Sequence, residues 1–109
     1  MMKSVLAPLQ AEGYIFRRFE PFSPKKVGSR KRISIFHGVD LHNRYLLVFA
    51  INRRSRVVVK EVKEWLELKS MIEVYCGYAI RINIALVEAP LCSKAAALLE
   101  SEGWRVVSR

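Results

Sequence analysis

Apolar residues recur along this chain with two different periods, and each period predicts a different kind of element. Runs 32–40, 45–51 and 79–87 are rich in aliphatic and β-branched residues, which predicts strands. Five of the seven residues in 45–51 are aliphatic, so we expect that strand to be covered on both faces. Between 58 and 76 the spacing changes to three and four, which predicts an amphipathic helix ending at Gly77, with apolar positions Val58, Val62, Trp65, Leu68, Ile72 and Tyr75.

The remaining segments complete an alternating succession of helices and strands. We expect helices at 2–12 and 93–102, and strands at 14–19 and 104–107, with Pro21 and Pro90 as breaks. Residues 21–31 hold two prolines, a glycine and four bases, which predicts a flexible basic loop. The order α-β-β-β-α-β-α-β indicates an α/β fold in which helices cover the faces of a central sheet. We interpret residues 1–109 as a single domain.

Composition is that of an ordinary globular protein. Of the 109 residues, 51% are hydrophobic and 27% charged, and no apolar run approaches about 18 residues, so we expect no membrane span. The first residues lack the apolar core of a signal peptide, which favours a cytoplasmic location. Cys76 and Cys92 lie far apart without a Cys-x-x-Cys motif, so we expect buried free thiols rather than a disulfide framework or a zinc site.

Charge changes this picture because it is concentrated in one segment. The net charge is +9, and residues 21–60 carry ten bases against the single acid Asp40. Those bases are Lys25, Lys26, Arg30, Lys31, Arg32, Arg44, Arg53, Arg54, Arg56 and Lys60. A concentrated positive field attracts polyanions, which favours nucleic acid as the partner. The alternative is a basic protein whose scattered charges serve only to keep it soluble.

Asp40 is the only aspartate, and it ends a strand with the sequence Val-Asp-Leu. After it come a short turn, the apolar strand Leu-Leu-Val-Phe-Ala-Ile-Asn, a basic turn, a long helix ending in Gly, a strand, and Ser-Lys-Ala-Ala-Ala-Leu-Leu-Glu-Ser-Glu-Gly-Trp. Over roughly residues 2–107 this order resembles the restriction-endonuclease-like PD-(D/E)xK superfamily, and its spacing is most similar to archaeal Holliday-junction resolvases and related small nucleases. The resemblance implies a three-layer core with a central mixed β-sheet flanked by helices.

The resemblance also implies a metal-dependent reaction. In that superfamily the aspartate and an acid-x-Lys on the next strand place a divalent metal, whose water attacks a phosphodiester. Asp40 takes the first position, and the next strand offers Phe49-Ala-Ile51 or Ala50-Ile-Asn52, neither of which holds an acid or a lysine. We therefore expect a degenerate catalytic site.

Glu61-Val-Lys63 is an acid-x-Lys in sequence and could be a relocated motif. If active, the chain would be a Mg²⁺-dependent endodeoxyribonuclease with Asp40 as metal ligand and Glu61 and Lys63 as catalytic partners. On a helix, Glu61 and Lys63 lie about 200° apart and cannot both face one metal ion. Either Glu61 or Glu64 could then face the metal, but the acid-x-Lys motif could not act as a whole. A solvated helix face is the alternative for this segment.

Nucleic-acid binding is the function that these patterns favour, with double-stranded or branched DNA implied by the resemblance. Predicted phosphate contacts are Lys25, Lys26, Arg30, Lys31, Arg32, Arg53, Arg54 and Arg56. The chain could instead be a non-catalytic subunit of a DNA-repair or RNA-processing complex, as a homodimer or as a heterodimer with a catalytic paralogue. Exposed sides of Trp65 and Trp104 would then be candidate docking surfaces.

Overall fold

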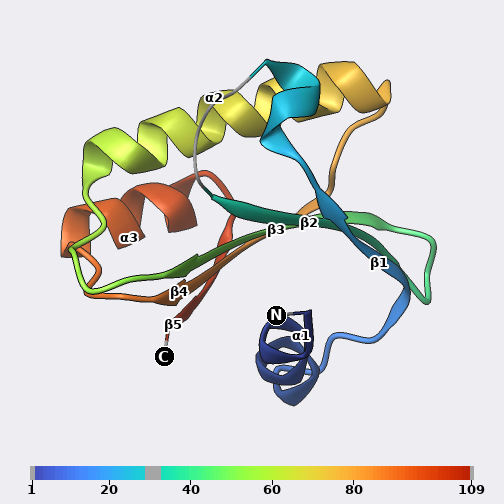
Figure 1. The fold of residues 1–109 in the computed structure, drawn as a ribbon, viewed down its shortest axis with the longest axis horizontal. Coiled ribbons are helices and arrows are strands. Elements are labelled where there is room, and N and C mark those ends of the chain that lie inside the picture. Colours follow the sequence, from blue (N-terminus) through green and yellow to red (C-terminus); the bar gives the residue numbers. More distant parts are fainter. Residues whose placement is uncertain (1, 29–32, 109) are drawn as a thin grey trace.

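The computed structural model describes residues 2–28 and 33–108, which form a β-sheet between two layers of helices (Figure 1). The elements are α1 (Met2–Ala11), β1 (Phe16–Phe22), the 3-10 helix η1 (Pro24–Val27), β2 (Ser34–Asp40), β3 (Tyr45–Asn52), α2 (Val59–Cys76), β4 (Ile82–Glu88), α3 (Ser93–Ser101) and β5 (Arg105–Ser108). This confirms the predicted succession α-β-β-β-α-β-α-β. The one addition is η1, which lies inside the segment expected to be an irregular loop.

The sheet is mixed, with strand order β1-β2-β3-β4-β5. β1, β2 and β3 pair in antiparallel fashion, and β3, β4 and β5 pair in parallel. The parallel neighbours are joined by α2 and α3, because a parallel pair needs a crossover connection. β3 lies at the centre, and residues 46–49 have no exposed surface, which confirms that this strand is covered on both faces.

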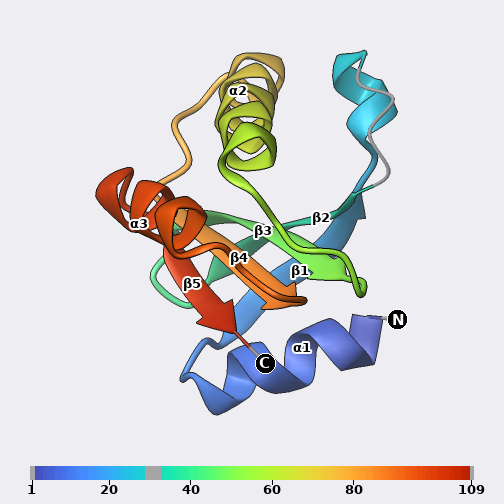
Figure 2. The ribbon, with the colours of Figure 1, turned by 90° about the vertical axis from the view of Figure 1, so that its left-hand side faces the viewer.

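Side chains alternate along β3 between two apolar clusters, one on each face of the sheet. Leu47 and Phe49 pack in the cluster beneath α2 and α3, while Leu46 and Val48 pack with α1 on the opposite face. Figure 2 shows α1 on one side of the sheet and both α2 and α3 on the other. The result is the expected three-layer core.

β1 differs from its predicted bounds, since it starts at Phe16 and continues through Pro21 to Phe22. It is an edge strand, where a proline without an N–H can be tolerated. A register shift between Phe16 and Arg18 adds one residue to β1 relative to β2. As a result Phe16 and Phe19 both pack against the cluster on the α1 side of the sheet. These aromatic residues are half-buried, so they contribute to core packing.

Trp65 and Trp104 are core residues, which corrects the idea that their exposed sides could dock a partner. They are 3% and 4% exposed, and both rings pack against Phe49. Cys76 and Cys92 are free, as expected, but half-buried rather than buried. Within the described residues, no helix combines the length and apolar character that crossing a bilayer requires.

Candidate functional site

Asp40 organises the turn between β2 and β3. Its Oδ1 accepts hydrogen bonds from the backbone N–H groups of His42 and Arg44, both at 2.9 Å, and its Oδ2 accepts one from Arg44 Nε at 2.7 Å. Burial raises the pKa of Asp40, but these hydrogen bonds outweigh it and hold the pKa below its usual value. Most of the hydrogen-bonding capacity of this carboxylate is therefore used within its own turn.

Glu61 lies in the first turn of α2 and pairs with Arg53, which follows β3. Arg53 also donates from Nε to the carbonyl oxygen of Ser55 at 3.2 Å and from Nη2 to that of Arg56 at 3.1 Å. The hydrogen bond to Glu61 raises the pKa of the Arg53 guanidinium. Arg53 therefore shapes the turn before α2 instead of projecting freely as a phosphate contact.

Asp40 and Glu61 lie at opposite ends of β3. Val39 pairs with Tyr45 at the start of β3, whereas Glu61 contacts the residue just beyond its end. An eight-residue strand spans about 23 Å, and a Mg²⁺ ion must lie about 2.1 Å from each ligand. The structure does not bring Asp40, Glu61 and Lys63 together, so they do not fit one metal centre. In the part of the chain that is described, no group of three or more His, Cys, Asp or Glu side chains could hold a metal ion.

The end of β3 occupies the position that the resemblance gives to the acid-x-Lys motif. Ala50 lies opposite Ser34, Ile51 is buried in the α2-side cluster, and Asn52 is exposed. In the parallel register Asn52 lies opposite Glu88, an acid outside the predicted site residues. Its position at the end of a strand, just before Ala-Pro, is the signal that could have found it.

The predicted phosphate contacts fall into three groups. Lys25 and Lys26 are exposed on η1, and Arg54 and Arg56 are exposed in the turn before α2; we call these four residues the basic edge. η1 packs against the second half of α2, whereas this turn precedes the first residue of α2, so the two pairs lie toward opposite ends of that helix (Figure 1). Arg53 is held by Glu61. The predicted contacts Arg30, Lys31 and Arg32 lie outside the described residues.

Comparison with solved structures identifies the architecture. The apo form of EndoMS superposes with a TM-score of 0.63 at 18% sequence identity, over 99% of this chain and 45% of that one. The chain has a nuclease-like fold. The EndoMS-dsDNA2 complex gives a TM-score of 0.55 at 19% identity, over 98% of this chain and 44% of that one.

A repair endonuclease from Pyrococcus abyssi is also similar, with a TM-score of 0.52 at 19% identity over 84% of this chain. The chain spans less than half the length of each of these proteins. At such low identity the likeness establishes the fold. No protein-family model and no curated protein matches the sequence.

Proposed function

We propose that this chain binds DNA through the basic edge and that its catalytic site, inherited with a PD-(D/E)xK nuclease-like fold, is degenerate. Two features at one end of β3 carry the proposal. The exposed residues Arg54 and Arg56 follow that end, and the position of the acid-x-Lys motif holds Ala50, Ile51 and Asn52. Such an end can hold a phosphate backbone, but its motif positions lack the carboxylate and lysine that metal-dependent cleavage needs.

Several features support DNA as the polyanion. Lys25 and Lys26 on η1 and Arg54 and Arg56 before α2 form two separate exposed pairs, each of which can contact phosphates. Contacts of this kind are largely independent of sequence. One of the similar structures is a complex of EndoMS with double-stranded DNA, which favours a duplex, and the resemblance to Holliday-junction resolvases adds branched DNA as a candidate. A cytoplasmic location belongs to the same proposal.

An active Mg²⁺-dependent endonuclease is the second candidate. It is favoured by two acids near Arg53: Glu61 pairs with its guanidinium, and Glu88 lies at the adjacent end of β4, where its carbonyl oxygen accepts a hydrogen bond from the Arg53 N–H at 3.3 Å. Cleavage would require Arg53 to release Glu61. Substituting Glu61 by Gln would then abolish cleavage, whereas Asp40→Asn would leave it intact because Asp40 lies at the far end of β3.

The test is a binding titration of labelled duplex, four-way junction and single strand, followed by fluorescence anisotropy. We expect Arg54→Ala combined with Arg56→Ala to lower the slope of log affinity against log salt by about 2, one for each lost phosphate contact. Arg81→Ala combined with Arg105→Ala is the matched control, because both residues are exposed bases near the starts of β4 and β5, whereas Arg54 and Arg56 lie beyond the end of β3, which is parallel to them. The control should bind as the unmodified chain does.

The same samples, incubated with Mg²⁺ or Mn²⁺, separate the two candidates. Binding without cleavage supports the degenerate site and would direct a search for a catalytic paralogue as partner. Cleavage that is lost in Glu61→Gln would favour the active endonuclease over the degenerate site. If the chain binds none of the three DNAs at about 50 mM salt, the proposal that it binds DNA is wrong, since phosphate contacts are strongest at low ionic strength.

A further inference from the structure

Three ring side chains meet at the start of β3, at the end of that strand opposite to Arg54 and Arg56. His37 comes from β2, Tyr45 begins β3, and Tyr78 lies between α2 and β4. The ring centres of Tyr45 and Tyr78 are 3.9 Å apart, and that of His37 lies 6.0 Å from Tyr45 and 5.8 Å from Tyr78. We call these three residues the aromatic cluster. The proposed phosphate contacts do not involve it.

A hydrogen bond fixes the geometry of the aromatic cluster. The Tyr78 hydroxyl lies 2.6 Å from Nε2 of His37. Burial raises the pKa of Tyr78 and lowers the pKa of His37, so near neutral pH the hydroxyl keeps its proton and donates a hydrogen bond to the neutral imidazole. Tyr78 therefore holds its ring against Tyr45 before any ligand arrives. A binding surface that is already ordered loses less entropy on binding.

The Tyr45 ring is accessible although the residues that follow it in β3 are buried. Residues 46–49 have no exposed surface, whereas Tyr45 is 38% exposed. It belongs to neither apolar cluster of the core. Because Tyr78 stacks on one face of the Tyr45 ring, the exposed part of this side chain lies on the other face and on the ring edge.

Arg18 and Tyr45 lie on the same face of the sheet. Val39 of β2 pairs with Arg18 of β1 on one side and with Tyr45 on the other, and directly paired residues project their side chains to one face. Two strand spacings, about 10 Å in all, separate Arg18 from Tyr45. The Arg18 side chain is 75% exposed, and its ion pair with Glu20, at 4.0 Å, is too exposed to hold it firmly.

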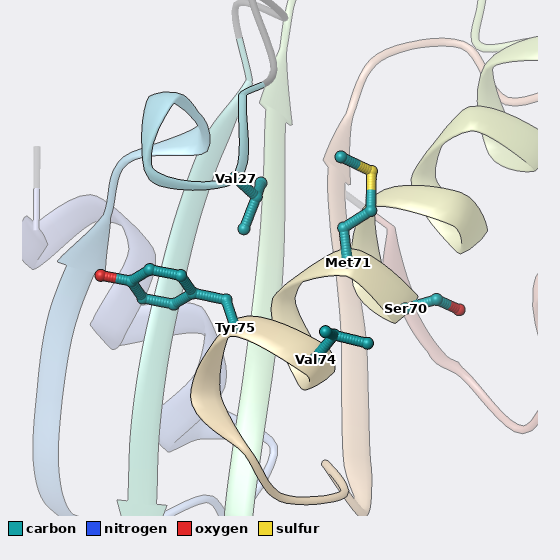
Figure 3. A pocket seen from close by; sticks show the side chains of 5 residues that line it. All are labelled: Val27, Ser70, Met71, Val74 and Tyr75. Atoms are coloured by element: carbon teal, nitrogen blue, oxygen red, sulfur yellow. The ribbon is translucent and has the colours of Figure 1, made fainter.

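Further cations lie on the half of α2 that leads to the aromatic cluster. Figure 3 shows Val27 of η1 beside the second half of α2, where the two elements line one open groove. Lys25 and Lys26 belong to the same 3-10 helix and are exposed. α2 ends two residues before Tyr78. This end of the molecule therefore offers both phosphate contacts and an exposed aromatic ring.

An exposed aromatic ring beside cations is suited to single-stranded nucleic acid. Every base has a flat face that can stack on such a ring, and every nucleotide carries a phosphate for a neighbouring cation. Inside a duplex the two faces of a base are covered by the bases above and below it, so a paired base cannot stack on Tyr45. The ligand that fits is an unpaired base, in a single strand or at a branch.

We propose that the aromatic cluster is a stacking site for an unpaired nucleobase. The base lies on the free face of Tyr45, the other two rings of the cluster hold Tyr45 in place, and Arg18 contacts the adjoining phosphate. This inference rests on the proposed DNA binding and specifies which part of the DNA this end of the chain recognises. Arg54 and Arg56 lie beyond the opposite end of β3, so the two sets of contacts can be measured separately.

Fluorescence anisotropy with a labelled single strand and a labelled duplex of the same length tests the proposal. We expect Tyr45→Leu to lower the affinity for the single strand about tenfold or more, and the affinity for the duplex less than about twofold, because only the unpaired base loses its stacking partner. Leucine keeps an apolar side chain over Tyr78, which preserves the fold. Tyr45→Phe is the matched control: it keeps the flat ring and should bind both DNAs as the unmodified chain does.

Two further measurements separate a stacking role from a structural one. Arg18→Gln should lower the slope of log affinity against log salt by about 0.7 for the single strand, the value for one lost phosphate contact. A fluorescent adenine analogue placed in the single strand reports stacking directly. Its emission should be quenched on binding to the unmodified chain and to Tyr45→Phe, but not on binding to Tyr45→Leu.

The duplex distinguishes failure of this inference from failure of the proposed function. If Tyr45→Leu binds the single strand as tightly as the unmodified chain and neither quenches the analogue, the stacking site is wrong, while binding of the duplex still supports DNA as the partner. Equal weakening for single strand and duplex also overturns the site, because Tyr45 would then act through the fold. If neither DNA binds at about 50 mM salt, the proposed function fails and the stacking site fails with it.

Discussion

Asp40→Ala should destabilise the fold because this carboxylate holds the β2–β3 turn together. The substitution removes the acceptor for three hydrogen bonds: the backbone N–H groups of His42 and Arg44 and the side chain of Arg44. Asp40 is 6% exposed, but His42 and Arg44 are exposed, so water can solvate part of what is lost. The variant should unfold as a less stable form of the same structure.

The hydrogen-bond partners of Asp40 set the expected magnitude. Hydrogen bonds to a charged group contribute about 1.5 to 3 kcal/mol each when well shielded, and solvation of the exposed turn reduces their sum to about 2 to 3 kcal/mol. For a domain of this size, such a loss lowers the melting temperature by about 8 to 12 °C. Asp40→Asn keeps one oxygen acceptor for the two backbone N–H groups but loses the charge and the acceptor for Arg44 Nε, and because Arg44 is exposed the loss should be about 1 kcal/mol.

Chemical unfolding followed by circular dichroism measures these changes, with His42→Ala as a control in the same turn. The folded pKa of Asp40 lies below its usual value, so its stabilisation is present above about pH 4 and is lost as the pH falls through the folded pKa. The difference between the unmodified chain and Asp40→Ala should therefore shrink in acid. If Asp40→Ala kept full stability but lost a Mg²⁺-dependent cleavage activity, the structural role assigned to Asp40 would be wrong.

Two further substitutions test the sheet. A Cβ atom at Gly38 would lie 2.8 Å from the backbone oxygen of Arg18, so Gly38→Ala should force β1 and β2 apart and cost about 1 to 3 kcal/mol, measurable by thermal unfolding. Burial lowers the pKa of His37, whose Nε2 lies 2.6 Å from the Tyr78 hydroxyl. His37 thus adds stability above about pH 6.5 that is lost as the pH falls through its folded pKa, and His37→Gln should remove this pH dependence between about pH 7.5 and 5.

Local patterns were sufficient to predict the elements of this fold. The three- and four-residue spacing from 58 to 76 predicted α2, and Gly77, with φ of 80°, ends it as a glycine in the left-handed region does. The continuous apolar run predicted that β3 is central. Both features depend on residues that are close in sequence, where helices and strands give characteristic spacings of apolar residues.

The extent of β1 was missed because a proline usually ends a strand. Pro21 can remain in β1 because β1 is the edge strand of the sheet that the described residues form, and that is a property of the sheet. The same reasoning applies to the tryptophans. The helix period placed Trp65 on the apolar face of α2, but only the packing of both rings on Phe49 decided that neither has an exposed side.

Sequence patterns establish the succession of elements, the concentration of positive charge in residues 21–60, and the absence of an acid-x-Lys on β3. What each charged group contacts depends on how the chain folds. The fold places Asp40 and Glu61 at opposite ends of β3, pairs Glu61 with Arg53, and leaves Arg54 and Arg56 exposed. The physical reason is that propensity and periodicity act between near neighbours, whereas ion pairs and exposure depend on which distant segments the sheet brings together.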